Sequence, residues 1–166
     1  MAASPEPALT VFAWGNESRG DDAIGAILAR KILDLNHPGI DVIEDHQLNL
    51  EHVMDIRDGV PVLFVDASVA IDKEYRLEKL RPVRDESIST HSISPGALLD
   101  LYEQTLRESA PDAYLLHVSG TSFELGEEIS AAASASVDQA WQFLGAVLSR
   151  PRDQWRACLE TASSPS

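Results

Sequence analysis

Two aspartates are the residues best placed for metal binding or acid–base chemistry, because each lies where an apolar segment ends. Asp66 closes the apolar run VPVLFVD, and Asp22 lies in the run GNESRGDD that follows the apolar segment 9–14. An ionised carboxylate beside a buried strand is costly unless it is paired, hydrogen-bonded or bound to a metal. The structural alternatives are hydrogen bonding of Asp66 to nearby backbone amides and capping of the next helix by Asp21. A helix N-cap needs only one acidic side chain, so if Asp21 is the cap, the carboxylate of Asp22 is free to bind a metal or to transfer protons.

A histidine would complete a site for a divalent cation. His91 lies in the polar run STHS, whereas His46 follows a predicted strand and is the rival ligand. His117 falls within a strand, where we expect it to be packed and hydrogen-bonded. Two carboxylates and one imidazole suit a hard-to-borderline divalent metal and leave positions for water or substrate.

Other familiar kinds of active site are missing from the sequence. The first loop has neither the Gly-Lys-Ser/Thr ending of ATP-binding loops nor the Gly-x-Gly-x-x-Gly of dinucleotide sites, and its two acids would repel a phosphate. There is no Gly-x-Ser-x-Gly elbow and no His-Glu-x-x-His helix. The single cysteine, Cys158, cannot form an internal disulfide, which suits a reducing cytoplasm.

The elements that must position these residues alternate along the chain. Apolar patterns predict strands at 9–14, 40–44, 60–66, 75–83 and 113–118, helices at 24–35, 95–106 and 134–148, and a short helix within 48–56. Pro82 marks the fourth strand as an edge. This alternation predicts a three-layer α/β/α fold with a mostly parallel central sheet of about five strands. Such folds bind ligands beyond the carboxyl ends of their strands, which is where Asp22 and Asp66 fall.

Length and composition indicate one acidic globular domain. We expect residues 1–150 to form a single α/β domain and residues 151–166 to be a flexible tail. The formal net charge of −14 argues against nucleic acid and anionic membranes as main partners. No apolar run approaches the roughly 20 residues that span a bilayer, and the first residues do not look like a secretion signal. The sequence therefore predicts a cytoplasmic protein, and nothing in it points beyond a monomer.

Four segments in order resemble the hydrogenase maturation endopeptidases. They are LTVFAWGNESRGDDAIGAILARKIL, VLFVDAS, STHSISPGALLDLY and SFELGEEISAAASASVDQAW, within residues 9–148. The chain also departs from that family. Relatives usually have Gly-x before the Gly-Asn pair, where this chain has Ala13-Trp14, and many have Asp-Gly-Gly-Thr where it has Asp45-His46-Gln47-Leu48.

The resemblance implies a peptidase that removes a C-terminal extension from the large subunit of a nickel–iron hydrogenase after metal insertion. It places the metal ligands at Asp22, Asp66 and His91. The nickel would be carried by the substrate, although another divalent metal could occupy the isolated protein. Gly15, Asn16, Gly20 and His46 are the expected substrate contacts.

Two questions stay open at this level. Asp22 or Asp66 could act as a general base on water, as in an aspartic-type hydrolase, or the nickel could polarise the carbonyl or the water. The alternative to an enzyme is a non-catalytic maturation chaperone that docks the metal-loaded large subunit without cutting it.

Overall fold

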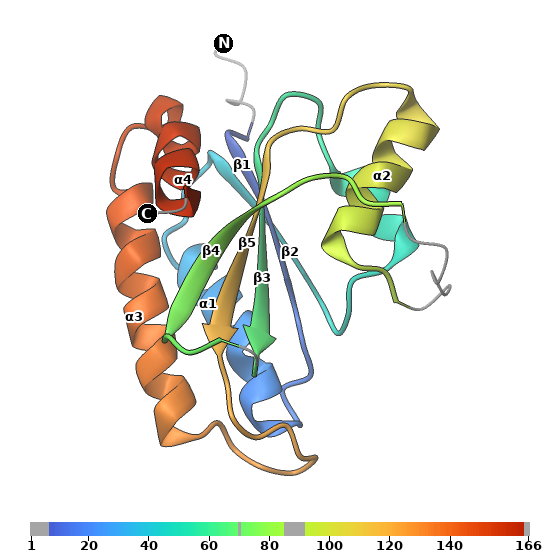
Figure 1. Cartoon of the computed structure of the whole chain (residues 1–166). Coiled ribbons are helices and arrows are strands. Elements are labelled where there is room, and N and C mark those ends of the chain that lie inside the picture. Colours follow the sequence, from blue (N-terminus) through green and yellow to red (C-terminus); the bar gives the residue numbers. More distant parts are fainter. Residues whose placement is uncertain (1–6, 70, 85–91, 165–166) are drawn as a thin grey trace.

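The computed structural model describes residues 7–69, 71–84 and 92–164, in which strands and helices alternate as predicted (Figure 1). The strands are β1 (Leu9–Trp14), β2 (Ile40–Asp45), β3 (Val62–Ser68), β4 (Tyr75–Leu80) and β5 (Ala113–Ser119). The α-helices are α1 (Ile24–Leu33), α2 (Pro95–Leu106), α3 (Ala131–Leu148) and α4 (Trp155–Ser163). Short 3₁₀ helices are η1 (Gly20–Ala23), η2 (Leu50–Asp55) and η3 (Arg152–Gln154).

The strands form one sheet in the order β2-β1-β3-β5-β4. Strands β2, β1, β3 and β5 are parallel to one another, and β4 runs antiparallel to β5 at one edge. The central strand β3 is fully buried from Val62 to Val65, which is why its sequence is a continuous apolar run rather than an alternating one. The predicted three-layer fold and the predicted edge strand are both confirmed.

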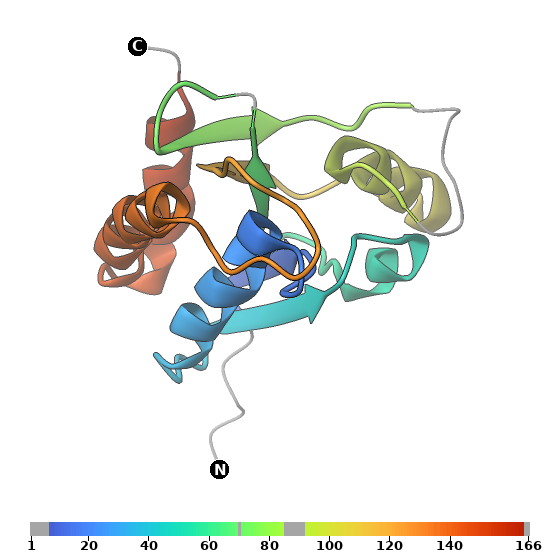
Figure 2. The same cartoon turned by 90° about the horizontal axis from the view of Figure 1, so that it is seen from below.

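Helices cover both faces of the sheet (Figure 2). On one face, α1, α3 and α4 enclose a core that includes Leu28, Val65 and Leu144. On the other face, η2 and α2 cover a smaller core around Phe12, Phe64 and Tyr102. In the described residues, no helix is both long and apolar enough to cross a membrane.

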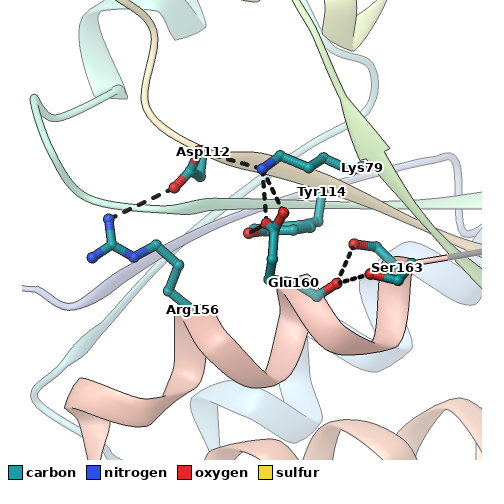
Figure 3. A network of polar contacts seen from close by, with 7 residues as sticks. Lys79, Asp112, Tyr114, Arg156, Glu160 and Ser163 are labelled. Carbon is teal, nitrogen blue, oxygen red and sulfur yellow. Dashed lines mark hydrogen bonds and ion pairs between the residues drawn. The ribbon is translucent and has the colours of Figure 1, made fainter.

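The expected flexible tail is wrong, because residues 155–163 form helix α4 and pack against the sheet. Trp155 and Leu159 are fully buried, and the indole N–H of Trp155 donates to the carbonyl oxygen of Arg150 at 2.9 Å. Glu160 of α4 accepts hydrogen bonds from Lys79 of β4 and from the Tyr114 hydroxyl of β5 (Figure 3). The apolar residues 155, 158 and 159 have helical spacing, but the polar, Ser-rich composition of the segment obscured it.

Replacing Leu159 by alanine is expected to lower the free energy of unfolding by about 2 kcal/mol, because the substitution leaves a cavity between α4 and the sheet. Urea unfolding followed by circular dichroism measures this change. The exposed neighbour Thr161 supplies the control, since Thr161→Ala removes no buried surface. An unchanged unfolding midpoint for Leu159→Ala would mean that α4 contributes nothing to the core.

Candidate functional site

Asp66 lies at the carboxyl end of β3, in the middle of the sheet, and is partly buried. Side chains alternate between the two faces of a strand, so Asp66 shares a face with Phe64, which packs in the core under α2. In the sheet, Asp66 lies beside His117 of β5. The structure therefore places this carboxylate where ligands of parallel α/β folds collect.

The loop after β1 brings Asp22 to the same end of the sheet. The backbone N–H of Asn16 donates to Oδ2 of Asp22 at 2.7 Å, so the loop folds back on the start of η1. Gly15 has φ +144°, and a Cβ at this position would lie 2.1 Å from the carbonyl oxygen of Asp22. Only glycine permits that approach. The substrate contacts expected at Gly15 and Asn16 stay predictions, because the interactions seen here are within the chain.

The two carboxylates interact electrostatically. Burial, together with the negative charge of Asp22, raises the pKa of Asp66 to about 6, and the N–H of Ala67 opposes the rise only in part. A carboxyl group with a pKa near neutrality can exchange protons with a substrate or a water molecule. A divalent cation would also relieve the repulsion between the two acids, so their arrangement suits either use.

Asp21 has a different role from its neighbour, because it ties the first loop to residues 120–130. It is fully buried. Its carboxylate accepts the backbone N–H groups of Thr121, Ser122 and Ser130 at 2.7, 3.0 and 2.7 Å, and the hydroxyls of Thr121 and Ser130 at 3.2 and 2.8 Å. Ser130 is the N-cap of α3. Asp21 thus joins the beginning of one helix to the beginning of another instead of capping its own.

Backbone contacts strengthen the connection between these two loops. The N–H of Gly20 donates to Glu127, that of Asp21 to Ser122 and that of Gly126 to Ser18, at 3.0, 2.7 and 2.6 Å. Gly20 has φ +56°, and a Cβ there would lie 2.6 Å from the carbonyl oxygen of Ser122. The substrate contact expected at Gly20 stays a prediction. Figures 1 and 2 both place residues 120–130 alongside η1 and the start of α1.

The hydrogen bonds to Asp21 keep it ionised despite its burial. Burial by itself would raise the pKa of this carboxyl group, but the bonds from Ser130, Thr121 and Ser122 outweigh that effect and lower the pKa to about 2. A buried carboxylate with this many donors acts as a fixed structural anion. We therefore assign Asp21 to loop positioning and keep Asp22 and Asp66 as the candidate reactive residues.

The histidines after β2 lie close to this region in different ways. His46 is exposed, and its carbonyl oxygen accepts the N–H of Gly15 at 3.1 Å, so the loop after β2 borders the loop after β1. His52 is buried; its Nδ1 accepts the N–H of Asn49 at 2.9 Å and its Nε2 lies 3.4 Å from Asp45. His52 therefore stabilises the turn, and the substrate contact expected at His46 stays a prediction.

His117 is packed and hydrogen-bonded, as the sequence predicts. Its Nε2 lies 2.8 Å from Oε2 of Glu78 on the neighbouring strand β4, and its side chain is largely buried. Glu78 is the partner that sequence reasoning could not name, because pairing of β4 with β5 depends on the order of strands in the sheet.

His91, the predicted third ligand, lies outside the described residues. Within residues 7–69, 71–84 and 92–164, no group of three or more His, Cys, Asp or Glu side chains is arranged to hold a metal ion. Two of the three predicted ligands are brought to the same end of the sheet, and the predicted metal site therefore stays a prediction.

Sequence reasoning also missed the residues that hold the site together. Thr121, Ser122 and Ser130 looked like ordinary loop residues, and only their contacts with Asp21 give them a role. The one available signal was Ser130 itself, because serine before a run of alanines is typical of a helix N-cap. Recognition of Ser130 as an N-cap would have predicted the start of α3 at Ala131, where the structure has it, instead of at residue 134.

Comparison with known proteins identifies the fold. No protein-family model matches this sequence, and no curated protein has a significantly similar sequence. Among solved structures, the NiFe hydrogenase maturation protease HycI from Thermococcus kodakarensis KOD1 superposes with a TM-score of 0.66 at 21% identity, covering 86% of this chain and 92% of that one. The hydrogenase maturating endopeptidase HybD from E. coli gives 0.63 at 18% identity, covering 85% and 92%.

A third solved structure, the hydrogenase 2 maturation peptidase from a Thaumarchaeota archaeon, gives a TM-score of 0.59 at 16% identity, with 84% of this chain and 97% of that one covered. These similarities span 84–86% of this chain and 92–97% of the other three. The chain therefore has the fold of the hydrogenase maturation proteases, the family that its four sequence segments resemble.

Proposed function

We propose that this protein is an endopeptidase that removes a C-terminal extension from the large subunit of a nickel–iron hydrogenase after metal insertion. The observation that supports this function most directly is the meeting of Asp22 and Asp66 at the carboxyl end of the sheet. There the charge of Asp22 helps to raise the pKa of Asp66 to about 6. The fold shared with HycI and HybD supports the same function.

In this proposal, nickel belongs to the substrate and serves as the recognition element. Asp22 and Asp66 provide two oxygen donors, and His91 is the proposed nitrogen donor. These three groups leave coordination positions open for ligands that the precursor already holds. Binding would thus be strong only for a precursor whose metal has been inserted. Bound nickel would supply Lewis-acid polarisation of a carbonyl group or a water molecule.

The chain's own part in peptide cleavage is to position the substrate and to accept a proton. Asp66, whose pKa is raised to about 6, suits the role of general base, because a base works best when its pKa lies near the working pH. Asp22 is fixed by the N–H of Asn16 and suits the role of an oriented ligand. The loop 120–130, which follows β5 and is held in place by Asp21, would border the bound substrate.

The decisive experiment measures the mass of a candidate large-subunit precursor after incubation with this protein. A nickel-loaded precursor is expected to lose the mass of its C-terminal extension, and the same precursor without nickel is expected to keep its full mass. Mass spectrometry of the intact chains reads both results. The protein must first be shown to be folded by circular dichroism.

The outcome separates the enzyme from the alternative. A nickel-loaded precursor that binds the folded protein but keeps its full mass would indicate a non-catalytic maturation chaperone and would contradict the endopeptidase. Cleavage that is equally fast with and without nickel would retain the peptidase and reject nickel as the recognition element.

A further inference from the structure

The edge strand β4 has one side of its backbone turned away from the sheet. The carbonyl oxygen of Glu74 accepts the N–H of Ser119, which lies opposite it when the β4–β5 register is extended by one residue. Bonded and outward residues alternate in an antiparallel ladder, so Tyr75, Leu77 and Lys79 direct their N–H and C=O groups outward. Within the described chain, no loop or helix backbone bonds to these three residues.

This edge also borders an open groove. The groove has a volume of about 1090 Å³, and β4, Phe143 and the last turn of α4 line it. The Lys79 ammonium group is drawn back to Glu160 and Asp112, away from the outer edge (Figure 3). An uncovered edge strand is a ready template for pairing with another strand.

We propose that the occupant of this edge is β4 of a second copy of the chain, paired antiparallel about a two-fold axis at Leu77. In this register Arg76 of each copy lies opposite Glu78 of the other, on the face of the sheet toward α2. Tyr75 lies opposite Lys79 on the other face. The sequence YRLEK is therefore complementary to itself when it is read antiparallel. Opposite charges placed directly across a pair of strands stabilise the pairing.

The charges also select this register from its neighbours. Residues whose N–H and C=O groups point outward must pair with one another across the two copies. The nearest alternative registers therefore place Arg76 opposite Arg76 or Glu78 opposite Glu78. Like charges directly opposite each other destabilise a pair of strands. Arg76 and Glu78 form non-hydrogen-bonded pairs in the Leu77 register, where facing side chains are closest. Beyond the strand, Lys73 would face Arg81, which confines the ladder to β4.

The paired copies would share one continuous sheet of twice five strands. In the sheet, β5 separates β4 from β3, the strand that carries Asp66. Pairing through β4 therefore leaves the site of Asp22 and Asp66 open in both copies. The proposal does not depend on the proposed function, and it departs from the monomer that the sequence led us to expect. The interface is a single edge of six residues, so we expect dimerisation to depend on protein concentration.

A charge-reversal experiment tests this interface. Light scattering after size-exclusion chromatography should give twice the monomer mass for the wild-type protein at high concentration. Arg76→Glu and Glu78→Arg should each give the monomer mass, because each brings like charges together across the two-fold axis. An equal mixture of the two variants should restore twice the mass, since every facing pair in the mixed dimer is again of opposite charge.

Arg150→Glu, at an exposed position just after the C-cap of α3, makes the same change of net charge as Arg76→Glu but lies outside β4 and should leave the dimer intact. Circular dichroism checks that each variant is folded. The proposal fails if the wild-type protein stays monomeric at all concentrations, even if the edge binds another extended peptide. It also fails if both single variants dimerise like the wild type, or if their mixture stays monomeric.

Discussion

Asp66→Asn is expected to abolish precursor cleavage and at the same time to make the folded protein more stable at pH 8. The first effect follows from the loss of the proposed base and metal ligand. The second follows from the pKa of Asp66, which rises in the folded protein from 3.8 to about 6 because ionisation there is opposed by burial and by Asp22. Each pKa unit corresponds to about 1.4 kcal/mol, so removal of the charge should add about 1–3 kcal/mol of stability.

The pH dependence of this gain has a definite sign. Between about pH 4 and pH 6 the folded protein binds more protons at Asp66 than the unfolded chain does, so this carboxyl group lowers stability as the pH rises through that window. The destabilisation is complete above pH 6 and absent below pH 4. The stability difference between Asp66→Asn and the wild type should therefore be largest at pH 8 and near zero at pH 4, as measured by urea unfolding.

Asp138→Asn supplies the matched control, because it makes the same chemical change at an exposed position on α3. It should change neither cleavage nor stability by more than a few tenths of a kcal/mol. Wild-type cleavage by Asp66→Asn would remove Asp66 from the proposed mechanism. A stability gain of equal size at pH 4 and pH 8 would show that the charge of Asp66 is not its source.

Asp21→Asn is expected to have the largest effect on stability, lowering the free energy of unfolding by about 3–5 kcal/mol at neutral pH. The wild-type carboxylate satisfies three backbone N–H groups and two hydroxyls. An asparagine amide has one oxygen and turns an NH₂ group toward those donors, which leaves buried polar groups unpaired. Cleavage should be lost as well, because the loop 120–130 is no longer held against the start of α1.

The wild-type protein should reveal the same anchor in acid. Its hydrogen bonds lower the pKa of Asp21 to about 2 in the folded protein. The stability that this group provides is therefore present above about pH 4 and is lost as the pH falls toward 2. Acid unfolding of Asp21→Asn should lack this component. Hydrogen exchange of the amides of Thr121, Ser122 and Ser130 provides a local readout, because their protection should fall by more than that of the β3 amides.

The adjacent Asp22→Asn variant is the control for this prediction. It should lose cleavage without any loss of stability, because an asparagine oxygen can still accept the N–H of Asn16 and removal of the Asp22 charge relieves its repulsion of Asp66. Similar stabilities for the two variants would contradict the division of roles between Asp21 and Asp22.

Much of the fold was predictable because its elements are encoded by local patterns. The apolar run at 62–65 predicts a buried central strand, and all of these residues are fully buried. Pro95 predicts the start of α2, which begins at that residue with Ser94 as its N-cap. Helix α4 was missed because only a few apolar residues mark its buried face and they lie in a polar, Ser-rich segment. Only packing against the sheet distinguishes such a helix from a loose tail.

The sequence by itself determined where the two candidate carboxylates lie, because Asp22 and Asp66 each follow an apolar strand and both must therefore reach the carboxyl end of a parallel sheet. Only the tertiary structure separated Asp21 from Asp22, since the donors to Asp21 lie about 100 residues away along the chain. The contact between His117 and Glu78 likewise depends on the place of β4 beside β5. Local patterns specify the strands and helices, whereas hydrogen bonds between distant loops and the order of strands arise only when the chain is folded.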